Sequence, residues 1–233
     1  MAIHSGRSII LTGFIGLFFL TSVAAANEIQ GTISMAPPYP AVKKIPVNEK
    51  YRDACSSEQE SQSLIVSHEG LVKNAVVFLE GDFKDEASVA VTDVPVIDQK
   101  RCNFTPHILI VGQGQPFRIS NSDPIAHDVR SFERAKMLFR FEMDSLEQPV
   151  EKKFEQPGIY LLRCGLHPWM HAFIVSAPHR YYAISDEQGK FELPNIPKGK
   201  YTLKIWHETL GEVKVPVDVS NSISDFSYTF ENH

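Results

Sequence analysis

The sequence predicts an all-β protein built from two small β units. Short runs rich in β-branched and aromatic residues recur at roughly eight- to ten-residue spacing and end at tight polar turns. The stretch SDEQGKFELPNIPKGKYTLKIWH shows this pattern clearly. With 233 residues, the chain is long enough for two small β domains with real cores, or for one large one.

Composition and charge are those of an ordinary globular protein. Hydrophobic residues make up 43% of the chain and charged residues 22%. The formal net charge of -5 gives no reason to expect binding to a polyanion. We therefore expect no nucleic-acid partner.

The first 26 residues have the organisation of a secretory signal peptide. Arg7 precedes an apolar run over 9–20, and small residues follow over 23–26. A retained membrane anchor is the alternative, but the run is short for a bilayer span of about 20 residues. We expect cleavage near Ala26, a periplasmic or secreted mature protein, and no membrane span after cleavage.

The N-terminal elements include two predicted strands separated by a long excursion. Residues 28–34 alternate like an edge strand, and the Pro-rich segment that follows cannot lie inside a sheet. Residues 36–63 are therefore predicted to form a long loop held down by Cys55. The segment 71–80 reads as a strand, and the polar segment 82–90 as exposed.

The central part predicts a run of strands and turns over 94–131. A buried strand at 108–111 is followed by a Gly-Gln-Gly turn and by a strand through Phe117 and Ile119. The turn Asn-Ser-Asp-Pro at 121–124 comes next. His127 stands just after this turn.

The next segments lead into a strand that ends at a cysteine. Residues 132–145 fit a short helix or an alternating strand about equally, and 150–154 reads as a strand. The turn at 156–158 delivers the chain into a strand at 159–164. Alternate residues of this strand share one inward face, namely Tyr160, Leu162 and Cys164.

The loop after this strand carries a set of metal-ligand side chains. Cys164, His167 and Met170 follow one another at three-residue intervals. Two His nitrogens, one Cys sulfur and a distant axial Met sulfur are the ligands of a blue-copper centre. His127 supplies the second His. Singly, a buried Cys or Met is more often a core residue, and the alternative is a fold that kept the loop without the metal.

The three cysteines bear on this proposal. An exported protein can form disulfides, and an odd number leaves one cysteine over. If Cys164 binds metal, Cys55 and Cys102 are the natural pair. Two unpaired thiols, or a bridge from Cys164 that abolishes the copper site, are the alternatives.

The region 105–177 resembles the cupredoxins, with a ligand loop most similar to the amicyanin type. The resemblance rests on FTPHILIVGQGQPFRISNSDPIAHDV and GIYLLRCGLHPWMHAFIV. It implies an eight-stranded Greek-key barrel with one type 1 copper centre, whose ligands are His127, Cys164, His167 and Met170. Cupredoxins commonly have Asn after the upstream His, where this chain has Asp128. A carboxylate there either tunes the site or is an exposed acid.

The resemblance implies an exported blue copper protein that carries single electrons. Pro168 and Trp169 would form an apolar docking rim around a nearly exposed edge of His167, for brief contact with a redox protein partner; Trp169 could equally be a packing residue. His171 is expected to point away from the metal. We expect no enzyme activity, because no His-x-His pairs for a second copper centre occur. The alternative is a copper carrier or sequestration protein.

The C-terminal part resembles the carboxypeptidase-regulatory or transthyretin-like β-sandwich, through SDEQGKFELPNIPKGKYTLKIWH. Strand features of that family lie at 31–33 and 75–79. We therefore expect a discontinuous sandwich made of 27–93 and 179–233, with the cupredoxin domain, 94–178, inserted. Two consecutive domains are the simpler alternative, but 55 residues, 179–233, is thin for an independent sandwich. The sequence does not determine the oligomeric state.

Overall fold

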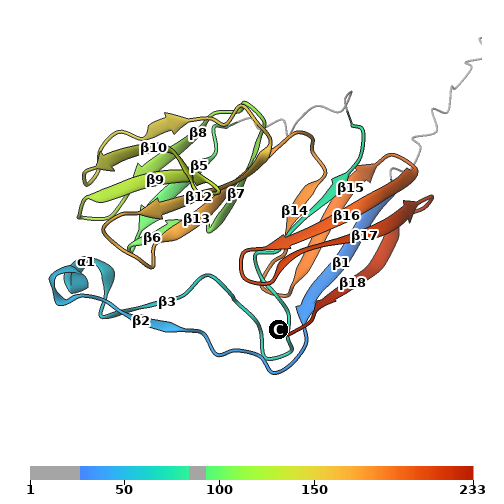
Figure 1. Ribbon diagram of the computed structural model, residues 1–233, viewed down its shortest axis with the longest axis horizontal. Coiled ribbons are helices and arrows are strands. Elements are labelled where there is room, and N and C mark those ends of the chain that lie inside the picture. Colours follow the sequence, from blue (N-terminus) through green and yellow to red (C-terminus); the bar gives the residue numbers. More distant parts are fainter. Residues whose placement is uncertain (1–26, 84–92, 233) are drawn as a thin grey trace, which may run out of the picture.

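The computed structural model describes residues 27–83 and 93–232, which form two β-sandwich units side by side (Figure 1). The all-β prediction is confirmed. The predicted signal peptide, 1–26, and most of the polar segment 82–90 lie outside the described residues. Among the helices of the described chain, none has the length and apolarity needed to cross a membrane.

The first unit is assembled from both ends of the chain. Its two sheets have the strand orders β15-β1-β18 and β14-β4-β16-β17. A shared apolar core that includes Ile33, Leu79 and Leu203 lies between them. The strands of this unit thus lie before and after β5 to β13 in the chain. The strands are β1 (Asn27–Met35), β4 (Val76–Glu80), β14 (Tyr182–Ile184), β15 (Lys190–Ile196), β16 (Gly199–His207), β17 (Gly211–Val219) and β18 (Ile223–Phe230).

Two details of this unit differ from the sequence prediction. β1 pairs with β15 on one side and β18 on the other, so it is the middle strand of its sheet and not an edge strand. Its alternation arises because one face of the sheet is buried and the other is partly open. The strand expected from residue 71 begins at Val76, because Asn74 has φ 66°, a left-handed conformation that interrupts a strand.

The inserted unit consists of a five-stranded sheet, β10-β9-β12-β13-β7, and a four-stranded sheet, β11-β8-β5-β6. The resemblance implied eight strands, and the described residues form nine. Residues 132–145, which fitted a helix or a strand, comprise the end of one strand, a turn at Arg134 with φ 53°, and a second strand. The strands are β5 (Val96–Lys100), β6 (Asn103–Thr105), β7 (Ile108–Gly112), β8 (Phe117–Asn121), β9 (His127–Glu133), β10 (Lys136–Met143), β11 (Val150–Lys152), β12 (Gly158–Cys164) and β13 (His171–Ala177).

The predicted excursion forms an arm that runs from the first unit along the inserted unit (Figure 1). It contains the short ladder of β2 (Lys44–Pro46) with β3 (Glu58–Glu60), and η1 (Glu49–Tyr51) and α1 (Arg52–Cys55) between them. The expected disulfide is present and joins Cys55 of the arm to Cys102 of the inserted unit. We call residues 44–60 the capping arm.

The two units share a small apolar interface. Val76 of β4, Ile108 of β7 and Val175 of β13 are buried together in it. The rings of Phe173 and Trp206 meet edge to face across it, with centroids 5.0 Å apart. Burial of these side chains ties the units to each other through contacts as well as through the chain.

Candidate metal centre

Three of the predicted ligands converge inside the inserted unit. His127 starts β9, Cys164 ends the adjacent strand β12, and His167 lies in the loop that follows. The sulfur of Cys164 is 3.6 Å from Nδ1 of His127 and 3.5 Å from Nδ1 of His167. The two Nδ1 atoms are 3.1 Å apart. The donor atoms therefore form a compact triangle, and both His residues are fully buried.

The ligand loop is closed by backbone hydrogen bonds. The N–H of Cys164 donates to the carbonyl of Met170 at 3.0 Å, and the N–H of Met170 donates to that of His167 at 2.9 Å. Met170 is 1% exposed and packs in the same apolar cluster as Cys164. The alternation predicted for β12 is confirmed, because Tyr160, Leu162 and Cys164 are all buried. The strand thus delivers the thiol inward, and the loop returns Met170 next to it.

His127 is oriented by an acidic residue of the preceding turn. Its Nε2 lies 2.9 Å from Oδ2 of Asp123, which also accepts the backbone N–H of Cys102 at 2.8 Å. With the Nε2 proton directed at Asp123, Nδ1 faces Cys164: it donates to the sulfur when the ring is protonated and presents a lone pair when the ring is neutral. Burial lowers the pKa of His127, but its bonds to Asp123 and Cys164 outweigh burial, so the pKa is raised.

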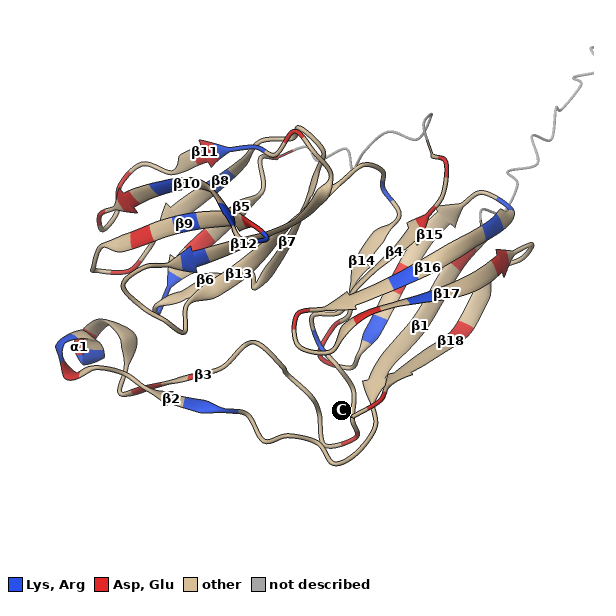
Figure 2. Cartoon of the chain, in the orientation of Figure 1, with Lys and Arg blue, Asp and Glu red and all other residues tan. Residues whose placement is uncertain are grey.

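Asp128 is 2% exposed, so the alternative of an exposed acid is wrong. Its carboxylate accepts from Nε of Arg130 at 3.0 Å and Nε of Arg140 at 2.8 Å. Acidic and basic positions accordingly lie side by side on β9 and β10 (Figure 2). The tie between the ligand loops comes from the backbone, where Gly165 N–H donates to the Asp128 carbonyl at 2.8 Å. A side chain at Gly165 would collide with the Asp128–Arg130 pair.

The thiol of Cys164 is prepared to ionise. Burial raises its pKa, but hydrogen bonds from His127 and His167 and from the backbone at Leu166 and Asp128 outweigh burial and bring the pKa to about 6. The N–H of Leu166 lies 3.4 Å from the sulfur. A thiolate is the form of cysteine that binds metals.

His167 does not have the nearly exposed edge that the expected docking rim would surround. This residue is fully buried. Tyr51 of the capping arm lies edge-on against it, with ring centroids 4.5 Å apart, and the disulfide sulfurs lie within 4.8 Å of a ring nitrogen. Trp169 turns inward, where its Nε1 donates to the Cys102 carbonyl at 2.9 Å, whereas Pro168 is exposed. The arm covers the edge because the disulfide fixes it there.

Asp123 and Tyr51 are residues that the sequence patterns did not single out as functional. Asp123 stands four residues before His127, a spacing that could have marked it as the partner of that ligand. Nothing in the sequence marks Tyr51, because it reaches His167 only through the fold and the disulfide.

The donor triangle fits a first-row metal ion such as copper. Taking the bond lengths of zinc sites, roughly 2.0 Å to nitrogen and 2.3 Å to sulfur, three donors in a trigonal plane lie about 3.5 Å apart for two nitrogens and 3.7 Å for nitrogen and sulfur. The corresponding separations here are 3.1 Å, 3.5 Å and 3.6 Å. Small outward shifts of the rings therefore accommodate the ion. Two imidazoles and a thiolate are also the donor types that copper prefers.

His171 points away from this triangle, as expected. Its Nε2 lies 2.8 Å from a carboxylate oxygen of Glu208, in the other unit. His207 is buried at the end of β16, where its Nδ1 accepts the backbone N–H groups of Thr209 and Leu210. Neither residue belongs to the donor triangle of His127, Cys164 and His167.

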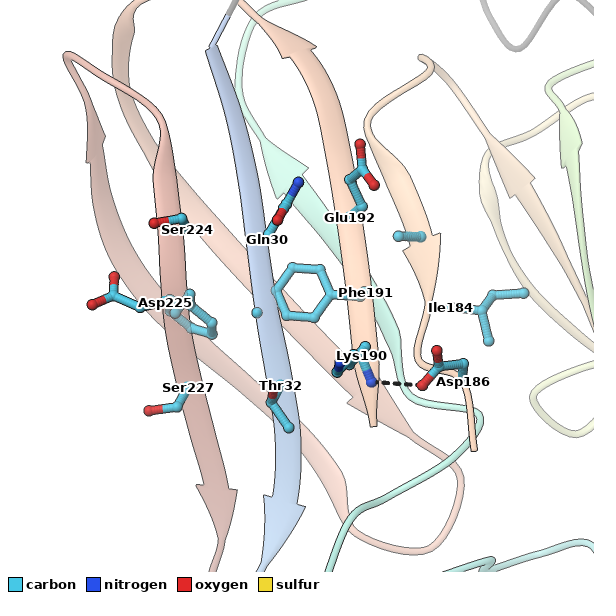
Figure 3. Close-up of a pocket in the computed structure, with 13 residues that line it drawn as sticks. Gln30, Thr32, Ile184, Asp186, Lys190, Phe191, Glu192, Ser224, Asp225 and Ser227 are labelled. Carbon is cyan, nitrogen blue, oxygen red and sulfur yellow. Dashed lines mark hydrogen bonds between the residues drawn. The ribbon is translucent and has the colours of Figure 1, made fainter. Parts of the chain in front are cut away.

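A hollow of about 740 Å³ lies elsewhere, on the outer sheet of the first unit (Figure 3). The ring of Phe191 lies across β1, next to Gly31, where a Cβ would stand 2.8 Å from that ring. Among the described residues that line the hollow there is no His, Cys or Met. It therefore offers none of the donors that the metal centre combines.

No protein-family model and no curated protein matches the chain. Solved structures similar to it include a purple cupredoxin from Nitrosopumilus maritimus, with a TM-score of 0.32, 22% identity, and coverage of 36% of this chain and 100% of that one. Amicyanin from Paracoccus versutus has a TM-score of 0.33 and 16% identity, with coverage of 43% of this chain and 96% of that one. The copper nitrite reductase of Thermus scotoductus has a TM-score of 0.31 and 19% identity, with coverage of 42% of this chain and 27% of that one.

Proposed function

We propose that the protein is an exported type 1 copper protein, periplasmic or secreted, that carries single electrons and is not an enzyme. The observation that carries this proposal is the buried triangle of His127, Cys164 and His167, with Met170 packed in the same cluster as Cys164. When bound there, copper supplies a one-electron couple between its +1 and +2 states.

The chain's own residues hold this site in a fixed shape. His127 and His167 would present imidazole nitrogens to the ion, Cys164 a thiolate, and Met170 a thioether sulfur. The Asp123 carboxylate keeps the tautomer of His127, and the closed loop keeps Cys164 and His167 in register. Ligands held in place by hydrogen bonds and burial change little between oxidation states, and burial excludes water.

The partner is proposed to be a redox protein that docks transiently near the ligand loop. Pro168 and Leu166 are exposed there, and the half-buried rings of Tyr51 and Trp169 contact His167. A small apolar patch suits a weak, short-lived interface. The first unit, which we propose to be transthyretin-like, would serve as a rigid platform or a second docking surface.

The decisive experiment is the visible spectrum of the copper-loaded protein. We expect an intense charge-transfer band from the Cys164 sulfur to Cu(II), which Cys164→Ser abolishes and His127→Ala weakens or shifts. His68→Ala, a substitution at an exposed histidine, is the control and should leave the band unchanged. A colourless Cu(II) protein would contradict the proposal.

One observation favours a second candidate, a copper carrier or sequestration protein. The capping arm covers His167, the ligand whose edge an electron-transfer partner would approach. The two candidates differ in kinetics. Fast electron exchange with a small redox reagent and slow copper loss to a chelator support the electron carrier, whereas slow electron exchange with ready copper loss supports the carrier of copper.

A further inference from the structure

Three ligand-type side chains outside the copper site converge where the two units meet. His107 precedes β7, His171 begins β13, and Glu208 follows β16 of the other unit. One donor atom from each residue lies within 4.8 Å of the other two. Oε2 of Glu208 is 2.8 Å from Nε2 of His171, and its Oε1 contacts Nε2 of His107. The carboxylate thus lies between two imidazoles.

The contacts of His171 leave a place between its ring and Glu208 that a proton or a metal ion must fill. Its Nδ1 lies 3.1 Å from the carbonyl of Trp169, and a carbonyl can only accept, so Nδ1 carries a proton. The Nε2 of a neutral ring then directs a lone pair at the Glu208 carboxylate. That contact requires a proton or a metal ion. A ring N–H held by a backbone carbonyl is also the usual support of a metal-binding histidine.

Glu208 is held in position by the turn between β16 and β17. Nδ1 of the neighbouring His207 accepts the backbone N–H of Thr209 at 3.2 Å and of Leu210 at 3.3 Å. These two hydrogen bonds close the turn that carries Glu208. Glu208 is therefore a positioned donor.

The cluster lies close to the surface. A groove of about 750 Å³ between the capping arm and the inserted unit is lined by His107. The side chains of His171 and Glu208 are 17% and 12% exposed, so the cluster is shielded but not sealed.

We propose that His107, His171 and Glu208 form a second metal site, which binds a divalent first-row ion such as Zn²⁺ and bridges the two units. Two imidazoles and one carboxylate are a donor set that suits zinc and leaves a coordination position for water. The site shares no ligand with the proposed copper centre, so it does not depend on it.

Zinc titration of the full chain tests this site, with bound metal counted after gel filtration. We expect Glu208→Gln and His107→Ala to remove one equivalent of zinc, or to weaken its binding at least a hundredfold. Cys164→Ser should retain that equivalent. The controls are Glu212→Gln, a matched change at a carboxylate that pairs with Lys204 on the same hairpin, and His68→Ala. Unchanged zinc binding by Glu208→Gln overturns the proposal.

Two further measurements separate this site from the copper centre. Cobalt(II) at the Glu208 site should lack the thiolate charge-transfer band that cobalt at Cys164 shows. In the unmodified chain, zinc should slow amide hydrogen exchange around His107, His171 and Glu208, and this result needs no variant to fold. Unchanged amide exchange at these positions overturns the proposal of a second metal site. A copper-loaded protein without the Cys164 band would contradict the copper proposal and leave the second site standing.

Discussion

At the scale of single residues, the chemistry of the site depends on hydrogen bonds that oppose burial. A buried thiol resists ionisation, yet Cys164 receives hydrogen bonds from two imidazoles and from backbone N–H groups. Asp123 fixes His127 in the tautomer whose Nδ1 faces the sulfur. The metal-free site is therefore already arranged as a set of donors, so metal binding needs little reorganisation.

This arrangement predicts the titration of Cys164 in the metal-free protein. Its thiolate should form with a midpoint at a pH of about 6, whereas the ordinary pKa of a cysteine thiol is 9.0. Because folding lowers this pKa, the resulting stabilisation is fully present above pH 9.0 and is lost as pH falls through about 6. The ultraviolet absorbance of the thiolate, with Cys164→Ser as the blank, measures the midpoint. A midpoint at or above 9.0 would show that the hydrogen bonds do not operate.

At the scale of elements, the capping arm decides how the site meets its surroundings. Its two short strands form a three-pair ladder, and its helical turns bury only Cys55. Elements this short do not hold a position by themselves. The disulfide to Cys102 and the contact of Tyr51 with His167 therefore keep the arm over the ligand loop.

Removing the disulfide should release the arm. The bridge spans 47 residues, so Cys55→Ser/Cys102→Ser should lower the free energy of unfolding by about 4 kcal/mol. Amide hydrogen exchange should rise over 44–60 while β12 stays protected, and copper should be lost faster. Ser57→Ala, at an exposed position of the arm, is the control. Unchanged exchange over 44–60 would mean that packing alone holds the arm.

At the scale of the whole molecule, the two units are held together by side-chain contacts as well as by the two chain segments that connect them. The apolar interface around Val76, Ile108 and Val175 is continuous with the Phe173–Trp206 contact and with the bridge through Glu208. Since β13 also follows directly from Met170, this interface contacts the strand that carries the end of the ligand loop.

Weakening the interface should separate the unfolding of the two units. Trp206→Ala removes the ring packed on Phe173 and should cost about 2 kcal/mol, less than a fully buried aromatic because Trp206 is half-buried. Differential scanning calorimetry should then resolve two transitions where the unmodified chain shows one. Met137→Ala, at a side chain that is 52% exposed, is the control and should leave a single transition. A single transition in Trp206→Ala as well would contradict this prediction.

Local patterns were enough to predict the all-β class and the inward row of β12, and the pairing of Cys55 with Cys102 followed once Cys164 was assigned to the metal. Period-two alternation, turn residues and a leftover cysteine are properties of neighbouring or countable residues, so they can be read without the fold. The middle position of β1 and the late start of β4 could not be predicted, because strand order and a single left-handed residue depend on long-range pairing and backbone conformation.

For the metal centre, the sequence by itself determined the types of donor and their spacing on the ligand loop. The sequence also named His127 as the second His. Only the tertiary structure decided that the three donor atoms lie 3.1 to 3.6 Å apart, and that His167 lies buried beneath Tyr51 and the disulfide. It also brought His107, His171 and Glu208 together from both units. Contacts between residues far apart in the chain depend on how strands cross and sheets pack, which spacing along the chain does not encode.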